Sequence, residues 1–107
     1  METFETTNEV IFRAPDLDAV KAYYAGRLEL EIVLEKDGMI GFDTGSFNMY
    51  FERGEPNGAV FEIEVDDVQG TKRELVENGC VVVEENPAIP RVYLRDPFGL
   101  TFNVTEV

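Results

Sequence analysis

The chain has 107 residues, of which 44% are hydrophobic and 29% are charged, enough for one hydrophobic core and too few for two independent domains. No stretch approaches the roughly 20 apolar residues that a transmembrane helix needs. The acidic N-terminus, residues 1–5, lacks the basic and then apolar order of a signal peptide. The single cysteine, Cys80, excludes an internal disulfide, so the fold needs no oxidising compartment. We expect a cytoplasmic protein that does not enter the membrane.

The net charge is −13, because 22 acidic residues outnumber 9 basic ones, and the sequence contains no histidine. We expect no nucleic-acid partner, since contacts to phosphates need a basic surface. The absence of histidine excludes Ser-His-Asp and Cys-His catalytic sites, so Cys80 is interpreted as a core residue rather than a nucleophile. The acidic surface has two interpretations. It keeps a small protein soluble, or it attracts a cationic ligand.

The first half of the chain predicts a strand, a helix and three further strands. Residues 9–16 alternate in polarity, with apolar side chains on one face of a strand and Glu9 and Arg13 on the other. Asp16 at the end of this strand is a predicted helix N-cap, and apolar residues recur at helical spacing from Leu17 to Leu28. The three strands that follow are predicted at residues 30–35, 39–43 and 47–52.

The second half of the chain repeats this order. Residues 60–67 alternate in the same way and end at Asp67, which is a second predicted N-cap. Asn78-Gly79 predicts the end of the helix that follows. Three strands are again expected, at residues 80–85, 92–95 and 100–105.

A short polar connector, residues 53–58, separates the two halves. The doubled order predicts an α+β fold built from two tandem β-α-β-β-β modules, at about residues 4–53 and 58–107. Together the modules are expected to form one domain, a curved, cup-shaped mixed sheet with the helices on one face.

Three segments of the chain match motifs of a known superfamily. They are residues 15–19 leading to Tyr23-Tyr24, residues 65–68, and the segment Tyr93-Leu94-Arg95-Asp96-Pro97-Phe98-Gly99. In this order, and within the doubled pattern, they make nearly the whole chain resemble the vicinal oxygen chelate superfamily. That superfamily includes glyoxalase I, bleomycin-resistance proteins, fosfomycin-resistance enzymes and extradiol dioxygenases. The last segment resembles the superfamily's Asp-Pro-x-Gly-Asn turn, although Leu100 replaces the asparagine.

The resemblance implies four positions at which metal-using members of the superfamily carry His, Glu or Gln ligands. In this sequence the four positions hold Glu9, Tyr50, Val60 and Asn103. Only Glu9 is a good ligand, whereas such an enzyme needs about three imidazole or carboxylate ligands and an open position. We therefore expect no metal and no other cofactor. A magnesium site that uses Glu52, Glu62 or Glu64 is an alternative if those carboxylates converge.

The inner wall of the predicted cup supplies the candidate ligand-binding residues. Strand alternation places six of them there, facing the single arginine Arg13: Glu9, Tyr50, Glu52, Glu62, Glu64 and Asn103. Acidic groups beside an aromatic ring suit a polar or cationic organic molecule. Alternatively, this face is only solvated, and the alternation records half-buried strands. Glu84 is expected to lie outside the cup.

Two function hypotheses stay open. The first is a metal-independent small-molecule-binding protein that resembles the bleomycin-resistance branch and forms a homodimer with two equivalent sites. The second is a metal-dependent lyase, isomerase or transferase with an unconventional ligand set. The sequence does not identify the small molecule.

Overall fold

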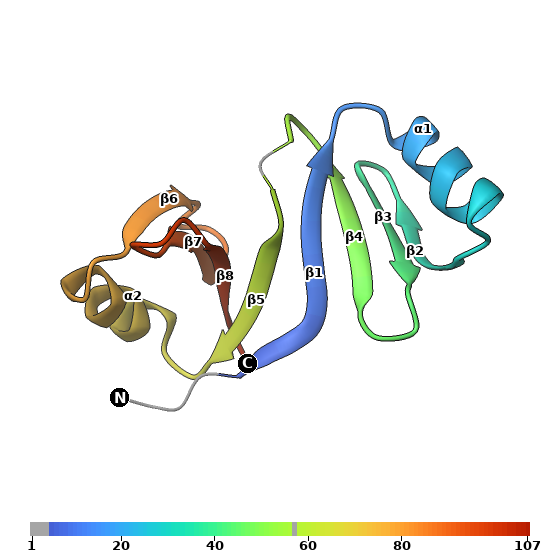
Figure 1. The fold of residues 1–107 in the computed structure, drawn as a ribbon. Helices are drawn as coiled ribbons and strands as arrows, with labels where there is room; N and C mark the ends of the chain where they lie inside the picture. Colours follow the sequence, from blue (N-terminus) through green and yellow to red (C-terminus); the bar gives the residue numbers. More distant parts are fainter. Residues whose placement is uncertain (1–4, 57) are drawn as a thin grey trace. The chain divides into compact units, whose positions relative to one another are not determined.

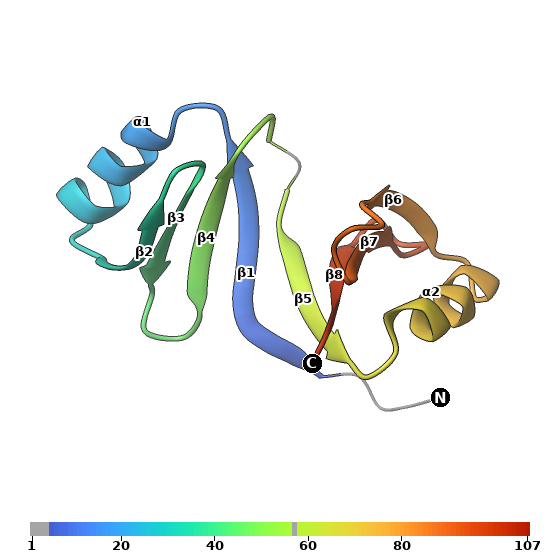
Figure 2. The same ribbon diagram turned by 180° about the vertical axis from the view of Figure 1, so that it is seen from behind.

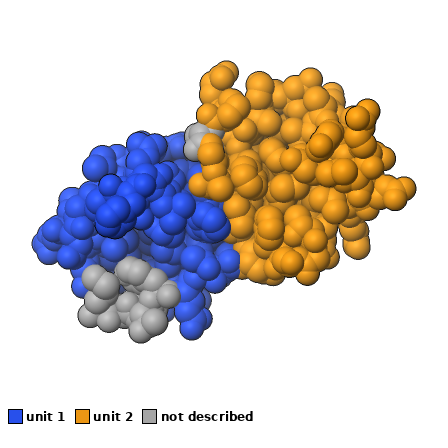
Figure 3. Space-filling model, viewed as in Figure 1, with its two compact units in different colours: residues 1–7, 60–107 blue, residues 8–59 orange. Residues whose placement is uncertain are grey.

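The computed structural model describes residues 5–56 and 58–107 of the chain. The chain divides into two compact units, coloured separately in Figure 3, and each is described by itself. Unit 1 comprises residues 1–7 and 60–107, and unit 2 comprises residues 8–59. The predictions for residues 1–4 of the N-terminal segment and for Asn57 in the connector lie outside the described residues.

Unit 2, described except for Asn57, has a strand, a helical segment and three more strands (Figure 1). Its elements are β1 (Thr6–Ala14, in this unit from residue 8), α1 (Leu17–Lys21), η1 (Ala22–Arg27), β2 (Glu31–Lys36), β3 (Met39–Asp43) and β4 (Asn48–Arg53). The strand order is β2-β3-β4-β1. β1 runs parallel to β4, and the other neighbouring strands are antiparallel, so the sheet places the first and last strands side by side.

Unit 1 has the same arrangement in the residues that the structure describes, as Figure 2 shows from behind. Its elements are β5 (Val60–Val65), α2 (Val68–Glu77), β6 (Val81–Glu85), β7 (Arg91–Arg95) and β8 (Thr101–Glu106). The strand order is β5-β8-β7-β6, with β5 parallel to β8 and the other neighbours antiparallel. The predicted α+β class and the doubled β-α-β-β-β order are confirmed.

Both predicted helix N-caps are confirmed. The carboxylate oxygen Oδ1 of Asp16 accepts a hydrogen bond from the backbone N–H of Ala19 at 3.1 Å. In the same way, Oδ1 of Asp67 accepts from the backbone N–H of Gly70 at 3.0 Å. Each aspartate satisfies a backbone donor that the first turn of a helix leaves unpaired, which is why the strands turn into helices at these residues.

The first helix differs from its prediction, which treated residues 17–28 as one regular helix. The α-helix ends at Lys21 and continues as the π-helix η1, in which the N–H of Leu28 bonds to the carbonyl of Tyr23 at 3.0 Å. Apolar spacing alone does not distinguish this wider turn from an α-helix. The second helix ends as predicted, at Asn78 and at Gly79 with φ +103°. Within the described residues, no helix has the length and apolar character needed to cross a membrane.

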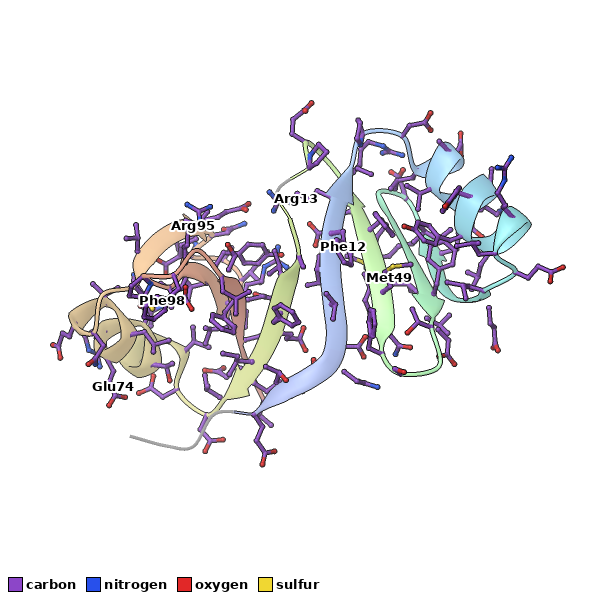
Figure 4. The ribbon with its side chains drawn as sticks, in the orientation of Figure 1. Phe12, Arg13, Met49, Glu74, Arg95 and Phe98 are labelled. Carbon is purple, nitrogen blue, oxygen red and sulfur yellow. The ribbon has the colours of Figure 1, made fainter. Side chains whose placement is uncertain are left out.

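The sheet of unit 2 packs one face against its own helical segment. The ring of Tyr24 on η1 lies with its centroid 5.6 Å from that of Phe42 and 5.4 Å from that of Phe51. Phe12, labelled on β1 in Figure 4, packs against the same cluster. The buried members of this core are Ile40, Phe42, Met49 and Phe51.

The sheet of unit 1 packs one face against α2. Leu75 of this helix, Cys80 and Phe102 pack around a buried cluster. The members of that cluster are Ile63, Val65, Val68, Val92, Leu94 and Val104. In both units, side-chain alternation turns the intervening residues to the opposite side of the sheet. We call this side, opposite the helix, the polar face of each unit.

A partly buried ion pair connects α2 to β6. Lys72 Nζ lies 2.6 Å from Glu85 Oε1, and Gln69 Nε2 donates a hydrogen bond to Glu85 Oε2 at 3.0 Å. The hydrogen bond from Lys72, and then that from Gln69, lower the pKa of the Glu85 carboxyl below its ordinary value. The contacts therefore stabilise the ionised carboxylate in the folded protein.

We predict that Glu85→Gln destabilises the protein at neutral pH and that this loss shrinks in acid. Because the folded-state pKa of Glu85 is lowered, its contribution is present above the unfolded-state pKa and is lost as the pH falls through the folded-state value. Urea unfolding of both proteins at neutral pH and near pH 3 measures the change. Glu77→Gln, at the end of the same helix, is the control. A loss of stability that is equal at both pH values would contradict the prediction.

Candidate functional site

The polar face of unit 2 is built on the parallel pair β1 and β4. Three cross-strand pairs lie on it, because the residues between them belong to the core on the helix side. These pairs are Glu9 with Asn48, Ile11 with Tyr50, and Arg13 with Glu52. Residues from two distant parts of the sequence are thus brought together in three rows.

Polar contacts lie at both ends of this arrangement. Asn48 Nδ2 donates a hydrogen bond to Glu9 Oε1 at 3.4 Å. At the other end, Arg13 Nε lies 3.7 Å from Glu52 Oε2, and the two side chains are only 24% and 19% exposed. Arg13 therefore offsets the charge of Glu52, whereas Glu9 receives a neutral donor.

The middle row of unit 2 is apolar and flat. Tyr50, which is half-buried, lies opposite Gly41 on β3, and Ile11 on its other side is 7% exposed. A methyl group at Gly41 would lie 2.5 Å from both Cδ1 and Cε1 of the Tyr50 ring. The ring therefore rests on the backbone of β3, in space that only glycine leaves open.

The polar face of unit 1 is built in the same way on β5 and β8. Glu62 pairs with Asn103, and Glu64 pairs with Thr105. Asn103 is 3% exposed, and its Oδ1 is buried without a hydrogen-bond partner among residues 5–56 and 58–107. Of the six candidate residues, three therefore lie in each unit. Glu9, Tyr50 and Glu52 share one polar face, and Glu62, Glu64 and Asn103 share the other.

The sequence analysis missed two residues on the polar face of unit 1. Tyr93 on β7 pairs with Asn103 and is 3% exposed. The guanidinium carbon of Arg91 lies 5.4 Å from the centre of the Tyr93 ring, a cation–π contact. The available signal was the alternation of Tyr93 with Val92 and Leu94, which pack on the helix side.

The expectation that Glu84 lies away from this face is wrong. The register of β6 shifts between Val82 and Glu84, so that Glu84 pairs with Tyr93. Together with Asn86 and Arg91, these two residues line a cavity of about 20 Å³. A one-residue irregularity in a strand moves the side chains that follow it to the opposite face of the sheet. A prediction that assumes strict alternation along β6 therefore misplaces Glu84.

The comparisons with known proteins agree with this architecture. A family model described as a glyoxalase-like domain matches residues 9–105. The chain belongs to this family. No curated protein sequence matches it significantly.

Solved structures share the fold. A glyoxalase/bleomycin resistance protein/dioxygenase superfamily member from Vibrio splendidus 12B01 has a TM-score of 0.67 at 14% identity, over 98% of this chain and 100% of that one. A Mn(II)-bound glyoxalase from Novosphingobium aromaticivorans has a TM-score of 0.64 at 27% identity, over 95% of this chain but 38% of that one. An extradiol ring-cleaving dioxygenase from B. fuscum has a TM-score of 0.63 at 16% identity. The match covers 92% of this glyoxalase-like chain and 31% of the dioxygenase chain.

The four residues that the resemblance assigns to ligand positions are a poor set of donors for a divalent metal. Glu9 is the one carboxylate among them, and Tyr50 and Asn103 offer neutral oxygens. Val60 offers no donor and is 0% exposed. Elsewhere in the described residues, no three Asp, Glu or Cys side chains gather where they could hold a metal ion.

Cys80 lies against the core of unit 1 rather than in a reactive position. Partial burial, and then the charge of Asp96, raise the pKa of its thiol above the ordinary value. Since the thiolate is the nucleophilic form, these surroundings disfavour a catalytic role for this residue.

We predict that Gly41→Ala in this glyoxalase-like domain costs about 1–3 kcal/mol of stability, because the added methyl group displaces the Tyr50 ring. The cost should fall in a Tyr50→Ala background, where the ring is absent. Denaturant unfolding of the four proteins measures both values. Gly26→Ala is the control, since nothing lies within 4 Å of a methyl group there. Equal costs in the two backgrounds would show that the ring does not rest on Gly41.

Proposed function

We propose that this glyoxalase-like chain is a metal-independent protein that binds a polar or cationic small organic molecule. The donor set at the superfamily's ligand positions carries the proposal, since one carboxylate, a phenol, an amide and a valine cannot hold a catalytic metal. The residues proposed to bind such a molecule are Glu9, Tyr50 and Glu52 on the polar face of unit 2 and Glu62, Glu64 and Asn103 on that of unit 1.

The charges on the polar faces support a ligand that is not an anion. On β1 and β4, the carboxylates of Glu9 and Glu52 share the face with Arg13. Across the strands of unit 1, three carboxylates share the face with two arginines: Glu62, Glu64 and Glu84 with Arg91 and Arg95. Because the whole chain has a net charge of −13, its electrostatic field favours the binding of a cation over that of an anion.

Tyr50 adds an apolar contact to these charges. Its half-buried ring lies over Gly41 and next to Ile11, between the two polar ends of the unit 2 face. An aromatic face flanked by acidic groups is suited to a flat or cationic group of an organic molecule.

A second candidate function is a metal-dependent lyase, isomerase or transferase. The observation that favours it is the 27% identity to the Mn(II)-bound glyoxalase over 95% of this chain. Such an enzyme would need ligands other than those at the four superfamily positions. Elemental analysis of the purified protein separates the two functions, because only the enzyme would carry near-stoichiometric metal.

We predict that removal of divalent metal leaves the melting temperature and any ligand affinity unchanged. A metal that binds the folded state alone would raise the melting temperature, so a protein without such a site responds neither to a chelator nor to added Mn(II). Differential scanning calorimetry before and after dialysis against a chelator tests this. A fall of several degrees would favour the metal-dependent alternative.

We predict that Glu9→Gln weakens the binding of an organic cation by about 10- to 100-fold, the usual effect of losing one charged hydrogen bond. A thermal-shift screen of organic cations supplies the ligand, and calorimetric titration measures its affinity. Glu77→Gln, on the exposed end of α2, removes the same charge as a control. Glu84 is unsuitable for this purpose, because it lies on the polar face of unit 1. Equal losses in the two variants would mean that net charge alone attracts the cation.

We also propose that the protein acts as a homodimer in the cytoplasm. The edge strand β6 supports the assembly, because Val81 is 63% exposed and Val83 is 43% exposed. An apolar edge strand that is open to solvent favours pairing with another chain.

A further inference from the structure

The amide of Asn103 lies in the middle of the polar face of unit 1. Its neighbours on β8, Phe102 and Val104, pack on the side of α2, so the amide points away from the helix. In the cross-strand register, Glu62 on β5 lies on one side of it and Tyr93 on β7 lies on the other. Three polar side chains therefore form a row across neighbouring strands.

The side-chain oxygen of Asn103 is buried without a hydrogen-bond donor among the described residues. Only 3% of Asn103 is exposed to solvent, and its Oδ1 has no hydrogen-bond donor in the described part of the chain. Folded proteins satisfy nearly all buried acceptors, because a desolvated carbonyl oxygen without a donor is unfavourable. A bound molecule or a buried water that carries an N–H or O–H group would satisfy this oxygen.

The chemistry of the row limits what that molecule can be. Asparagine presents an acceptor and an NH₂ donor in one plane, which matches another planar group that carries N–H. The Glu62 carboxylate lies one strand away, about 4.8 Å in a regular sheet, so two N–H donors of one planar group can reach both acceptors. An anionic group offers no donor and would face this carboxylate directly.

We infer that Asn103 is a specificity-determining residue that accepts a hydrogen bond from a planar nitrogen group of the ligand, of the amide, amidine or amino-heterocycle class. This inference rests on the proposed small-molecule-binding function and names the class of molecule bound. Asn103 supplies the acceptor common to the whole class. Glu62 supplies a charge that only the cationic members use.

The test uses three probes that share one ring and differ only in the attached group. Benzamidine is a planar cation with N–H donors, benzamide is neutral with N–H donors, and benzoate is an anion without them. Ligand-observed NMR on the full chain should detect binding of the first two and not of benzoate. Binding of benzoate with equal strength would overturn the inference.

Two variants then assign the contacts. Asn103→Leu, which keeps the side-chain size but has no polar atom, should weaken benzamidine and benzamide alike by at least about tenfold. Asn103→Ala should give the same pattern without added branching. Glu62→Gln should weaken benzamidine by at least about tenfold more than it weakens benzamide, since both probes can donate to residue 62 but only the cation also gains from its charge. Unchanged binding of both probes to the Asn103 variants would overturn the inference.

Stability gives an independent readout. Asn103→Leu should raise the melting temperature, because it removes a buried acceptor that has no partner in the free protein. A lower melting temperature of the variant would mean that the Asn103 amide already has a hydrogen-bond partner inside the protein. A higher melting temperature, together with no binding of any probe to the parent protein, would mean that a buried water satisfies the Asn103 oxygen. Either result overturns the inference. If benzamidine binding responds to Glu9→Gln but not to Asn103→Leu, the inference fails while the proposed function stands.

Discussion

In each unit, the first strand runs parallel to the last, β1 with β4 and β5 with β8. A parallel pair needs a long crossover connection, and here the crossover contains a helix and two further strands. The helix covers one face of the sheet with its apolar side chains, and only the other face is left for polar chemistry. The pairing therefore decides which distant residues meet there, Glu9 with Asn48 in one unit and Glu62 with Asn103 in the other.

The two polar faces use the same geometry but carry different polar groups. In unit 2, Glu9 accepts from Asn48, and Arg13 offsets Glu52. In unit 1, Asn103 holds a buried oxygen that no described residue satisfies. A carboxylate at this position would bring a negative charge to a metal or a cation, whereas the amide brings a neutral acceptor and an NH₂ donor.

The features that sequence predicted are those with a local cause. The two capping aspartates, Asp16 and Asp67, and the alternation of the paired strands depend on neighbouring residues alone, and the structure confirms them. The features it missed depend on contacts between strands. The shifted register that places Glu84 beside Tyr93 is one of these. The fit of the Tyr50 ring over Gly41 is another, since it involves residues on separate strands. The π-helical turn was missed for a different reason, because apolar spacing is nearly the same in both kinds of helix.

If the proposed metal-independent function holds, this glyoxalase-like domain obtains its affinity for a ligand in small increments. A charged hydrogen bond contributes about 1.5–3 kcal/mol, and an aromatic contact with a cation at a partly exposed site about 0.5–2 kcal/mol. A micromolar complex needs about 8 kcal/mol, so no single residue of the site suffices. Within one polar face, several contacts would have to act together, such as those of Glu62 and Asn103 in unit 1. This favours a ligand with several polar groups around a flat centre. The buried amide fits this requirement, because a group that is poorly satisfied in the free protein gains more from binding than one that water already solvates.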